Sequence, residues 1–196
     1  MRTLLVLALG LAVGQPLVRG ADIPLDDKTI VLGERVGPIE KGMTLTGLKT
    51  LFGGGKVKAG KIPGAEGEEI DGARMFAGTD REIEIVFDPE GNEKEILEVR
   101  IIGKGWKFEN GLKAGMTMTE VEKINGKAFQ IMGFNWDYGG FANFEGGKME
   151  GKVSVRFDPG EADVPGSLSG DRQISTKDKK LRALNPKVGE ITVFLR

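Results

Sequence analysis

The best candidates for catalysis in this sequence are carboxylates that lie close to aromatic residues. Asp137 stands between Trp136 and Tyr138, and Glu145 follows a few residues later. Two carboxylates can act as general acid and general base on a glycosidic bond, and aromatic rings commonly line the cleft around them. With 29 acidic residues in the chain, an acid beside an aromatic residue is also expected by chance. A carboxylate-based hydrolase acting on cell-envelope polysaccharide is therefore the alternative hypothesis for function.

The composition excludes most other catalytic and binding chemistries. The sequence contains no histidine and no cysteine, which excludes Ser-His-Asp triads, thiol nucleophiles and zinc sites built from cysteine and histidine. Its 28 basic and 29 acidic residues are balanced, so we expect no charge-driven binding of nucleic acid. We predict a protein that is not an enzyme and that uses no cofactor and no metal.

Three short segments look like ligand-binding loops but depart from the patterns that bind. Residues 55–62 nearly spell a phosphate-binding loop, but Ile62 stands where a hydroxyl should meet Mg²⁺. Residues 88–95 alternate oxygen-bearing side chains, but the closing Glu95 arrives too early for an EF-hand. The basic stretch 177–182 can meet anionic polymers or lipid headgroups. We expect instead a mobile basic loop without nucleotide, an ordinary turn, and a flexible solvated segment.

Aromatic residues are concentrated in one stretch of the second half of the chain. Phe134, Trp136 and Tyr138 alternate, which predicts a strand over 134–138 with all three rings on one face. That face is either part of the core or an exposed surface for a protein partner, since Trp and Tyr dominate protein interfaces. We predict that a partner binds through this stretch, at Phe134, Trp136, Asp137, Tyr138, Phe141 and Phe144.

A repeated motif indicates the elements that must position this stretch. Residues 42–53 and 115–126 share the pattern G-M-T-x-T-x-[LV]-x-x-[LI]-x-G. In the second copy, Thr117 and Glu120 have the spacing of a capping box, and Gly126 supplies a left-handed stop. Each copy predicts a helix of about two turns, which is too short to persist alone and must pack on a sheet.

Alternating apolar residues predict the strands that follow each helix. These strands are expected near 73–77, 82–87 and 96–102 in the first half, and near 134–138, 152–157 and 190–195 in the second. We predict an α+β fold of two tandem units, each a short helix packed on a three- or four-stranded antiparallel meander. The expected segments are a lead-in at 21–35, a first repeat at 36–104, and a second repeat at 105–196 with a polar insertion at 160–187.

The first 20 residues have the pattern of a secretory signal peptide. Arg2 precedes an apolar run at 4–13, and Val18 and Gly20 stand three residues and one residue before the expected cleavage point. The run is too short to cross a bilayer. We expect an exported protein, periplasmic or secreted, without a membrane span. Because the chain has no cysteine, we do not expect a lipoprotein.

The two copies of the helix motif, extended to 39–53 and 112–126, resemble the helix entry of the β-lactamase inhibitor protein fold. That superfamily includes small outer-membrane assembly lipoproteins of the SmpA/OmlA type. Residues 125–129 and 133–140 also look like a group of uncharacterised secreted bacterial proteins. The resemblance implies a helix-plus-meander fold and a concave sheet face, formed by both units, that grips a partner. The chain differs from these relatives in having no cysteine for a lipid or a disulfide.

These observations favour binding over catalysis. The leading hypothesis is an exported bacterial envelope protein that binds a protein partner through a sheet face and is not catalytic. The partner is expected in the envelope or the extracellular space, and neither nucleic acid nor nucleotide is expected to bind.

Overall fold

The computed structural model of the protein describes residues 23–90 and 94–195. The expected signal peptide at 1–20 lies outside the described residues, and so does part of the segment 88–95, where a turn is expected. Within the described ranges, no helix has the length and apolar character needed to cross a membrane.

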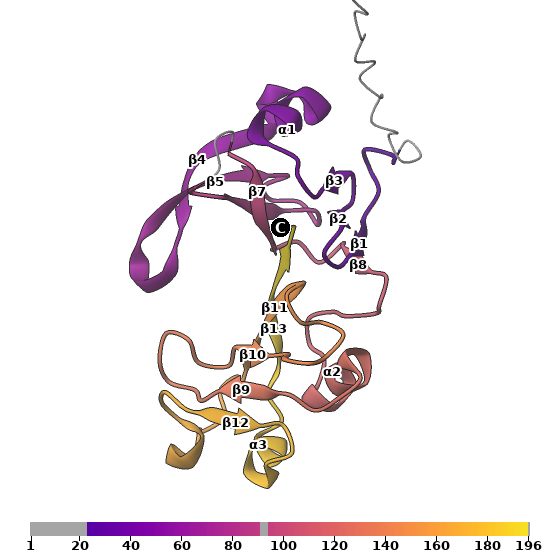
Figure 1. The fold of residues 1–196 in the computed structure, drawn as a ribbon. Helices are drawn as coiled ribbons and strands as arrows, with labels where there is room; N and C mark the ends of the chain where they lie inside the picture. The colour runs from indigo at the N-terminus through magenta and orange to yellow at the C-terminus, as the bar shows by residue number, and fades with distance from the viewer. Residues whose placement is uncertain (1–22, 91–93, 196) are drawn as a thin grey trace, which may run out of the picture.

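A six-stranded antiparallel sheet runs through the centre of the molecule (Figure 1). Its strands, in spatial order, are β11 (Val153–Asp158), β13 (Lys187–Phe194), β7 (Ile96–Ile101), β6 (Ile83–Phe87), β5 (Glu69–Met75) and β4 (Val57–Pro63). Strand β13 pairs with β7 so that Val193 lies opposite Val99. One sheet therefore contains strands from both halves of the chain.

Two smaller sheets complete the β-structure. The first has the order β3-β2-β1-β8 and the second the order β10-β9-β12. Their bounds are β1 Thr29–Val31, β2 Arg35–Val36, β3 Ile39–Glu40 and β8 Lys107–Phe108, then β9 Gln130–Met132, β10 Ala142–Asn143 and β12 Gln173–Ser175. Because β1 pairs in parallel with β8, the first described residues are joined to the middle of the chain.

The helices are short and begin and end where local sequence chemistry dictates. They are α1 (Leu45–Phe52), α2 (Met118–Asn125) and α3 (Lys179–Leu184), with 3₁₀ turns η1 (Gly54–Lys56), η2 (Ala65–Gly67) and η3 (Gly166–Leu168). The Thr44 hydroxyl accepts a hydrogen bond from the N–H of Gly47, and Thr117 and Glu120 form a reciprocal capping box. Gly126 ends α2 in the left-handed conformation. The predicted capping box and left-handed stop of α2 are confirmed.

The predicted α+β class is confirmed. Helix α1 is followed by the four-stranded antiparallel meander β4-β5-β6-β7. The strands that follow α2 divide between two sheets: β9, β10 and β12 form the small sheet, whereas β11 and β13 join the large one. This division leaves the large sheet with one continuous surface that spans the two halves of the chain.

The two faces of the large sheet differ in polarity. One face carries fully buried apolar side chains, such as Ile85, Val99, Val193 and Val155, which belong to a single core cluster. That cluster also contains Leu48 of α1, Val121 of α2 and Leu181 of α3. The opposite face carries charged and polar side chains and remains partly open to solvent.

Two expectations about loops are wrong. Residues 55–62, expected as a mobile loop, form most of η1 and β4, and Val57 and Ile62 are buried. The stretch 177–182, expected as a flexible solvated segment, leads into α3, whose Leu181 is fully buried. In both cases the basic side chains face solvent, but apolar residues between them pack into the protein and fix the backbone.

Candidate functional site

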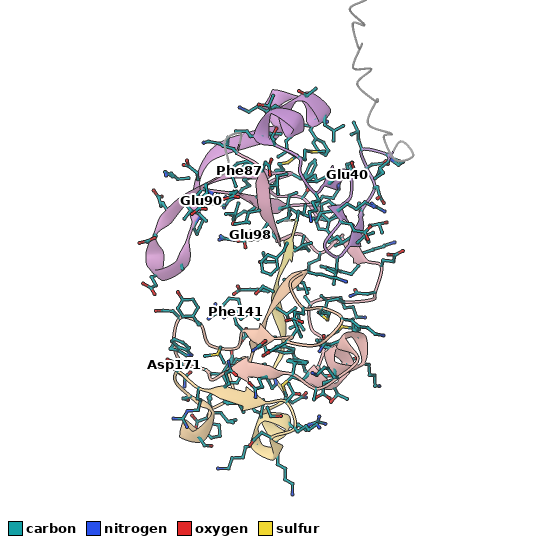
Figure 2. The ribbon with its side chains drawn as sticks, in the orientation of Figure 1. Glu40, Phe87, Glu90, Glu98, Phe141 and Asp171 are labelled. Carbon is teal, nitrogen blue, oxygen red and sulfur yellow. The ribbon has the colours of Figure 1, made fainter. Side chains whose placement is uncertain are left out.

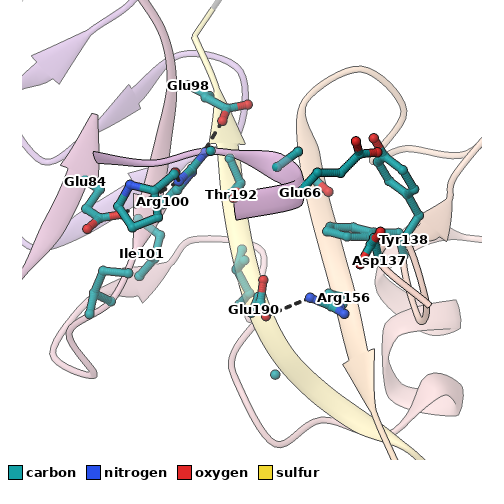
Figure 3. A pocket seen from close by; sticks show the side chains of 18 of the residues that line it. Glu66, Glu84, Glu98, Arg100, Ile101, Asp137, Tyr138, Arg156, Glu190 and Thr192 are labelled. Atoms are coloured by element: carbon teal, nitrogen blue, oxygen red, sulfur yellow. Dashed lines mark hydrogen bonds and ion pairs between the residues drawn. The ribbon is translucent and has the colours of Figure 1, made fainter. Parts of the chain in front are cut away.

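A groove of about 1090 Å³ lies on the polar face of the large sheet. Its floor is formed by β6, β7, β13 and β11, one wall by the tip of the β4–β5 hairpin, and the other wall by the loop that follows β9 (Figure 3). The lining residues that carry charges are Glu66, Glu84, Glu98, Arg100, Asp137, Arg156 and Glu190. The groove therefore combines side chains from both halves of the chain.

A row of paired residues crosses the large sheet, and its members on β6, β7, β13 and β11 lie on the floor of the groove. Arg74 lies opposite Glu84, Glu84 opposite Arg100, Arg100 opposite Thr192, and Thr192 opposite Ser154. Because directly opposite residues in an antiparallel sheet point to the same side, this register places one side chain from each of five strands in a single line. The register of the sheet thus sets the order of charges on the floor.

Glu84 is the buried centre of the charges on the floor. It is 6% exposed, forms an ion pair with Arg74, and has the guanidinium of Arg100 3.8 Å away. The hydrogen bond and negative charge of Glu84 raise the pKa of Arg74. Arg100 also lies 3.6 Å from the carboxylate of Glu98. A buried carboxylate needs such partners, since an unpaired one is costly to desolvate.

The β4–β5 hairpin forms one wall, and Gly72 allows it to pack closely on the neighbouring strand. Gly60 and Gly72 are paired opposite each other. A Cβ on Gly72 would lie 2.3 Å from Cδ1 of Ile62 and 2.6 Å from the carbonyl oxygen of Ile85. The missing side chain therefore makes room for Ile62, which is 4% exposed. At the tip, the Pro63 carbonyl accepts a hydrogen bond from the guanidinium of Arg100.

The opposite wall is a loop, so the predicted strand at 134–138 is wrong. A Cβ on Gly133 would lie 2.5 Å from the carbonyl oxygen of Gly170, and Asn135 has φ +64°. This close backbone contact and left-handed residue turn the chain, and the indole N–H of Trp136 then donates to the Gly133 carbonyl at 2.8 Å. The alternation of aromatic residues here does not reflect a strand.

The aromatic side chains of this loop differ in how far they are buried. Phe134 is buried at 3% exposure, Trp136 is half-buried, and Tyr138 is 44% exposed. The rings of Trp136 and Tyr138 contact each other edge to face, with centroids 5.3 Å apart. Only the end of the alternating stretch therefore reaches the groove.

Arg156 of β11 connects this loop to the sheet. Its Nε donates to the Gly139 carbonyl at 2.8 Å, and its guanidinium lies over the ring of Phe141, 5.2 Å from the centroid. The same guanidinium is 3.4 Å from a carboxylate oxygen of Glu190 on β13. These contacts hold the aromatic wall against the floor.

The structure brings four of the six predicted partner-binding residues together. Trp136, Asp137, Tyr138 and Phe141 line the groove. Phe134 and Phe144 are 3% and 4% exposed and belong to the core. Phe134 also borders a smaller hollow of about 460 Å³, and the Phe144 ring packs against Phe129 at 4.9 Å. Both were expected at a binding surface, but their rings are used for packing.

Two carboxylates at the mouth of the groove differ from those on the floor. Glu66, at the hairpin tip, and Asp137, in the aromatic loop, face the opening beside Tyr138 (Figure 3). Across the described part of the chain, neither has a basic side chain within ion-pair distance. The mouth therefore carries negative charge that no basic side chain of residues 23–90 and 94–195 pairs with.

The acid pair behind the hydrolase hypothesis is not brought together in this groove. Asp137 lines the groove, whereas Glu145 is an exposed residue outside it. Among the described residues, no group of three or more acidic side chains has a geometry that could hold a metal ion. Gly91 and Asn92, in the segment compared with an EF-hand, lie outside the described residues.

Sequence reasoning missed the hairpin tip and the charged floor. Glu66, Glu84, Arg100 and Glu190 were not singled out, although they line the groove. Alternation within β6, β7 and β13 indicates which of their residues share a face. It does not indicate that β13 pairs with β7, and only that pairing places these charges in one groove.

Comparisons with known proteins show a similarity to a solved structure. No protein-family model matches the chain, and no curated protein matches it. The chain is similar to the crystal structure of the uncharacterized protein yfeY from Escherichia coli, with 17% sequence identity and a TM-score of 0.45. The similarity covers 83% of this chain and 97% of that chain. The resemblance to the β-lactamase inhibitor protein fold stays a prediction.

Proposed function

We propose that the protein is an exported, non-catalytic protein of the bacterial envelope that binds a protein partner in the groove. The observation that carries the proposal is the position of Trp136 and Tyr138. Their rings contact each other on the wall of a groove whose floor contains strands from both halves of the chain. Tyr and Trp are enriched at protein interfaces and among the residues that contribute most to binding energy.

The open shape of the groove favours a polypeptide over a small molecule. Small-molecule pockets usually enclose about 300–1,000 Å³ and bury most of their ligand. This groove has about 1090 Å³ and is open along the face of a sheet. An extended segment of a partner would fit such a shape, with its side chains reaching both walls.

The groove is also ordered before any partner arrives. The Arg100 guanidinium holds the hairpin tip through Pro63, and Arg156 holds the aromatic loop through Gly139. A surface whose side chains are already fixed loses less conformational entropy on association. This supports binding by a preformed site.

The proposal is tested by capture from the native envelope fraction, followed by titration with the purified captured protein. We expect Trp136→Ala/Tyr138→Ala to weaken the titrated affinity by about 30-fold or more, because truncation of an aromatic hot spot costs about 2 kcal/mol or more. Tyr138→Ala alone is a milder variant, since it leaves the Trp136 to Gly133 hydrogen bond in place.

The matched control is Leu25→Ala, which removes an exposed apolar side chain (48% exposed) outside the groove. Its affinity should equal that of the unaltered protein. A folded double variant that binds the captured protein as tightly as the original chain would overturn the proposal. Folding of each variant is checked by its near-UV circular dichroism and its unfolding midpoint.

A further inference from the structure

We infer that the groove recognises a polypeptide segment that presents a lysine or arginine side chain to its mouth, between Glu66 and Asp137 and beside Tyr138. This inference rests on the proposed function, because it names the chemistry of the partner that the same groove binds. Three observations carry it: the charge of the groove, the position of the exposed Tyr138 ring, and a cluster of one arginine, one ring and one carboxylate that the groove already contains.

The charged side chains that line the groove are mostly acidic. Five carboxylates and two guanidinium groups line it: Glu66, Glu84, Glu98, Asp137, Glu190, Arg100 and Arg156. The two guanidinium groups are already used on the floor, since Arg100 lies near Glu84 and Glu98, and Arg156 near Glu190. The remaining negative charge is concentrated at the mouth, where a cation from a partner would be attracted and an anion repelled.

An exposed ring lies where the stem of a long basic side chain would pack. Tyr138 is 44% exposed and contacts Trp136 edge to face. Lysine and arginine bury their methylene stems on apolar surface while their charged ends stay near polar groups. A cation close to the face of a tyrosine ring gains further attraction. The ring and the two carboxylates therefore offer complementary contacts to one side chain.

Within the groove, one of the protein's own arginines already makes the contacts that we infer for the partner's basic side chain. The guanidinium of Arg156 lies over the ring of Phe141, at 5.2 Å, and pairs with Glu190 at 3.4 Å. At the mouth, Tyr138 supplies the ring and Asp137 and Glu66 supply the carboxylates, without a cation from the described chain. A partner's basic side chain would complete this second arrangement.

The experiment uses a random heptapeptide library displayed on phage, with the folded chain as bait. We expect peptides selected on the unaltered protein to be enriched in lysine or arginine next to apolar residues. We expect no such enrichment when the bait is Glu66→Gln/Asp137→Asn. These changes keep the shapes of the side chains and remove only their charges, and both positions are exposed.

Synthetic versions of the best selected peptide then measure the effect of the charge. Replacing its basic residue by norleucine should weaken binding to the unaltered protein by about three- to tenfold, as expected for two exposed ion pairs. The same replacement should have no effect on binding to Glu66→Gln/Asp137→Asn. Raising the salt concentration should weaken binding of the lysine peptide but not binding of the norleucine peptide.

The matched control is Glu145→Gln/Glu161→Gln, which removes two charges from exposed residues outside the groove. It should bind the lysine peptide as the unaltered protein does. Equal loss of affinity in this control would show a general effect of net charge and overturn the inference.

The remaining outcomes separate this inference from the proposed function. If the norleucine peptide binds as tightly as the lysine peptide, and Trp136→Ala/Tyr138→Ala abolishes both, the cation site is wrong but the groove still binds polypeptide. If the selected peptides bind that double variant unchanged, both proposals fail. Failure to select any peptide, or selection without basic residues, also overturns the inference.

Discussion

The guanidinium of Arg100, on β7, donates a hydrogen bond to the backbone carbonyl of Pro63 at the end of β4. The same guanidinium lies 3.8 Å from the buried carboxylate of Glu84. One side chain therefore connects the floor of the groove to the hairpin that forms its wall. Figure 2 labels Glu98, which pairs with the same guanidinium, and Phe141, which lines the groove from the other half of the chain. The position of the hairpin tip depends on a charge in the middle of the sheet.

Replacing Arg100 by methionine should loosen the hairpin tip. The variant keeps the apolar stem but loses the hydrogen bond to Pro63 and one partner of Glu84. We expect the free energy of unfolding to fall by about 1–2 kcal/mol and the amides of residues 65–67 to exchange faster with solvent. Arg172→Met, at an exposed arginine outside the groove, is the control. Unchanged exchange at the tip of the Arg100 variant would show that Pro63 is held by other contacts.

Gly72 should be intolerant of a side chain, whereas the glycine opposite it should accept one. A Cβ at Gly72 would lie 2.6 Å from the Ile85 carbonyl oxygen, which is backbone and cannot move cheaply, and 2.3 Å from Ile62. We expect Gly72→Ala to lower the free energy of unfolding by about 1–3 kcal/mol. At Gly60 nothing lies within 4 Å of the added Cβ, so Gly60→Ala should be neutral or stabilising by up to about 1 kcal/mol. Urea denaturation gives the free energy of unfolding of both variants. Equal changes in the two variants would contradict the close packing of Gly72.

Helix α1 should become more stable if Gly47 is replaced by glutamate, the residue at the equivalent position of α2. Gly47 stands in α1 where Glu120 stands in α2, and only α2 has the complete capping box. A Cβ on Gly47 meets only the side chains of Met43, at 3.1 Å, and Thr44. Met43 is half-buried and flexible, so it can move by a few tenths of an ångström. We expect Gly47→Glu to raise the free energy of unfolding by about 1 kcal/mol, from helix propensity and capping together. A lower unfolding midpoint would show that Met43 is fixed in place.

The capping box of α2 should make stability depend on pH in the acidic range. The backbone N–H and the hydroxyl of Thr117 donate to the Glu120 carboxylate and hold its pKa below the ordinary value of 4.5. Folding therefore favours the charged form of Glu120. The stability that this carboxylate contributes is complete above pH 4.5 and is lost as the pH falls through the lowered pKa. In Glu120→Gln the amide makes a neutral cap that does not titrate. The difference in unfolding midpoint between the two proteins should shrink from pH 7 to pH 3; a constant difference would contradict this.

Local features of the fold could be predicted from the sequence because their causes are local. The caps at Thr117 and Gly126 depend on residues a few positions apart, so the motif was enough to place both ends of α2. Strands β6, β7, β11 and β13 were predicted from their alternation for the same reason. Which strands become neighbours depends on contacts distant in sequence. The pairing of Val99 with Val193, which unites the halves of the groove, therefore had no signal in the motif.

The candidate site was predicted in part, and the errors have a physical cause. Trp136 and Tyr138 were assigned to a strand because they alternate with Phe134. The backbone instead turns at Asn135, where Gly133 packs against the carbonyl of Gly170. That contact joins segments more than thirty residues apart, and the presence of a glycine at position 133 does not indicate which segment packs against it. A cluster of aromatic residues could be recognised from the sequence, but its division between core and groove depended on this packing.

A buried hydroxyl should contribute to the attachment of the insertion after β11 to α2. Thr176 is fully buried; its Oγ1 accepts from the N–H of Phe129 at 3.3 Å and donates to the Glu122 carboxylate. Arg182 of α3 pairs with the same carboxylate at 3.0 Å and donates to the Thr176 carbonyl at 2.7 Å. Thr176→Val keeps the volume of the side chain but removes the hydroxyl. The Phe129 N–H and one oxygen of Glu122 then lose a partner inside the protein.

We expect Thr176→Val to lower the free energy of unfolding by about 1–3 kcal/mol, the cost of leaving buried polar groups unsatisfied. Thr119→Val makes the same chemical change at an exposed position of α2 and should change stability by less than about 0.5 kcal/mol. Amides of α3 should exchange faster in the Thr176 variant, because its contact with α2 passes through the same carboxylate. If both variants unfold at the same urea concentration, apolar packing by Leu181 rather than the polar network holds the insertion in place.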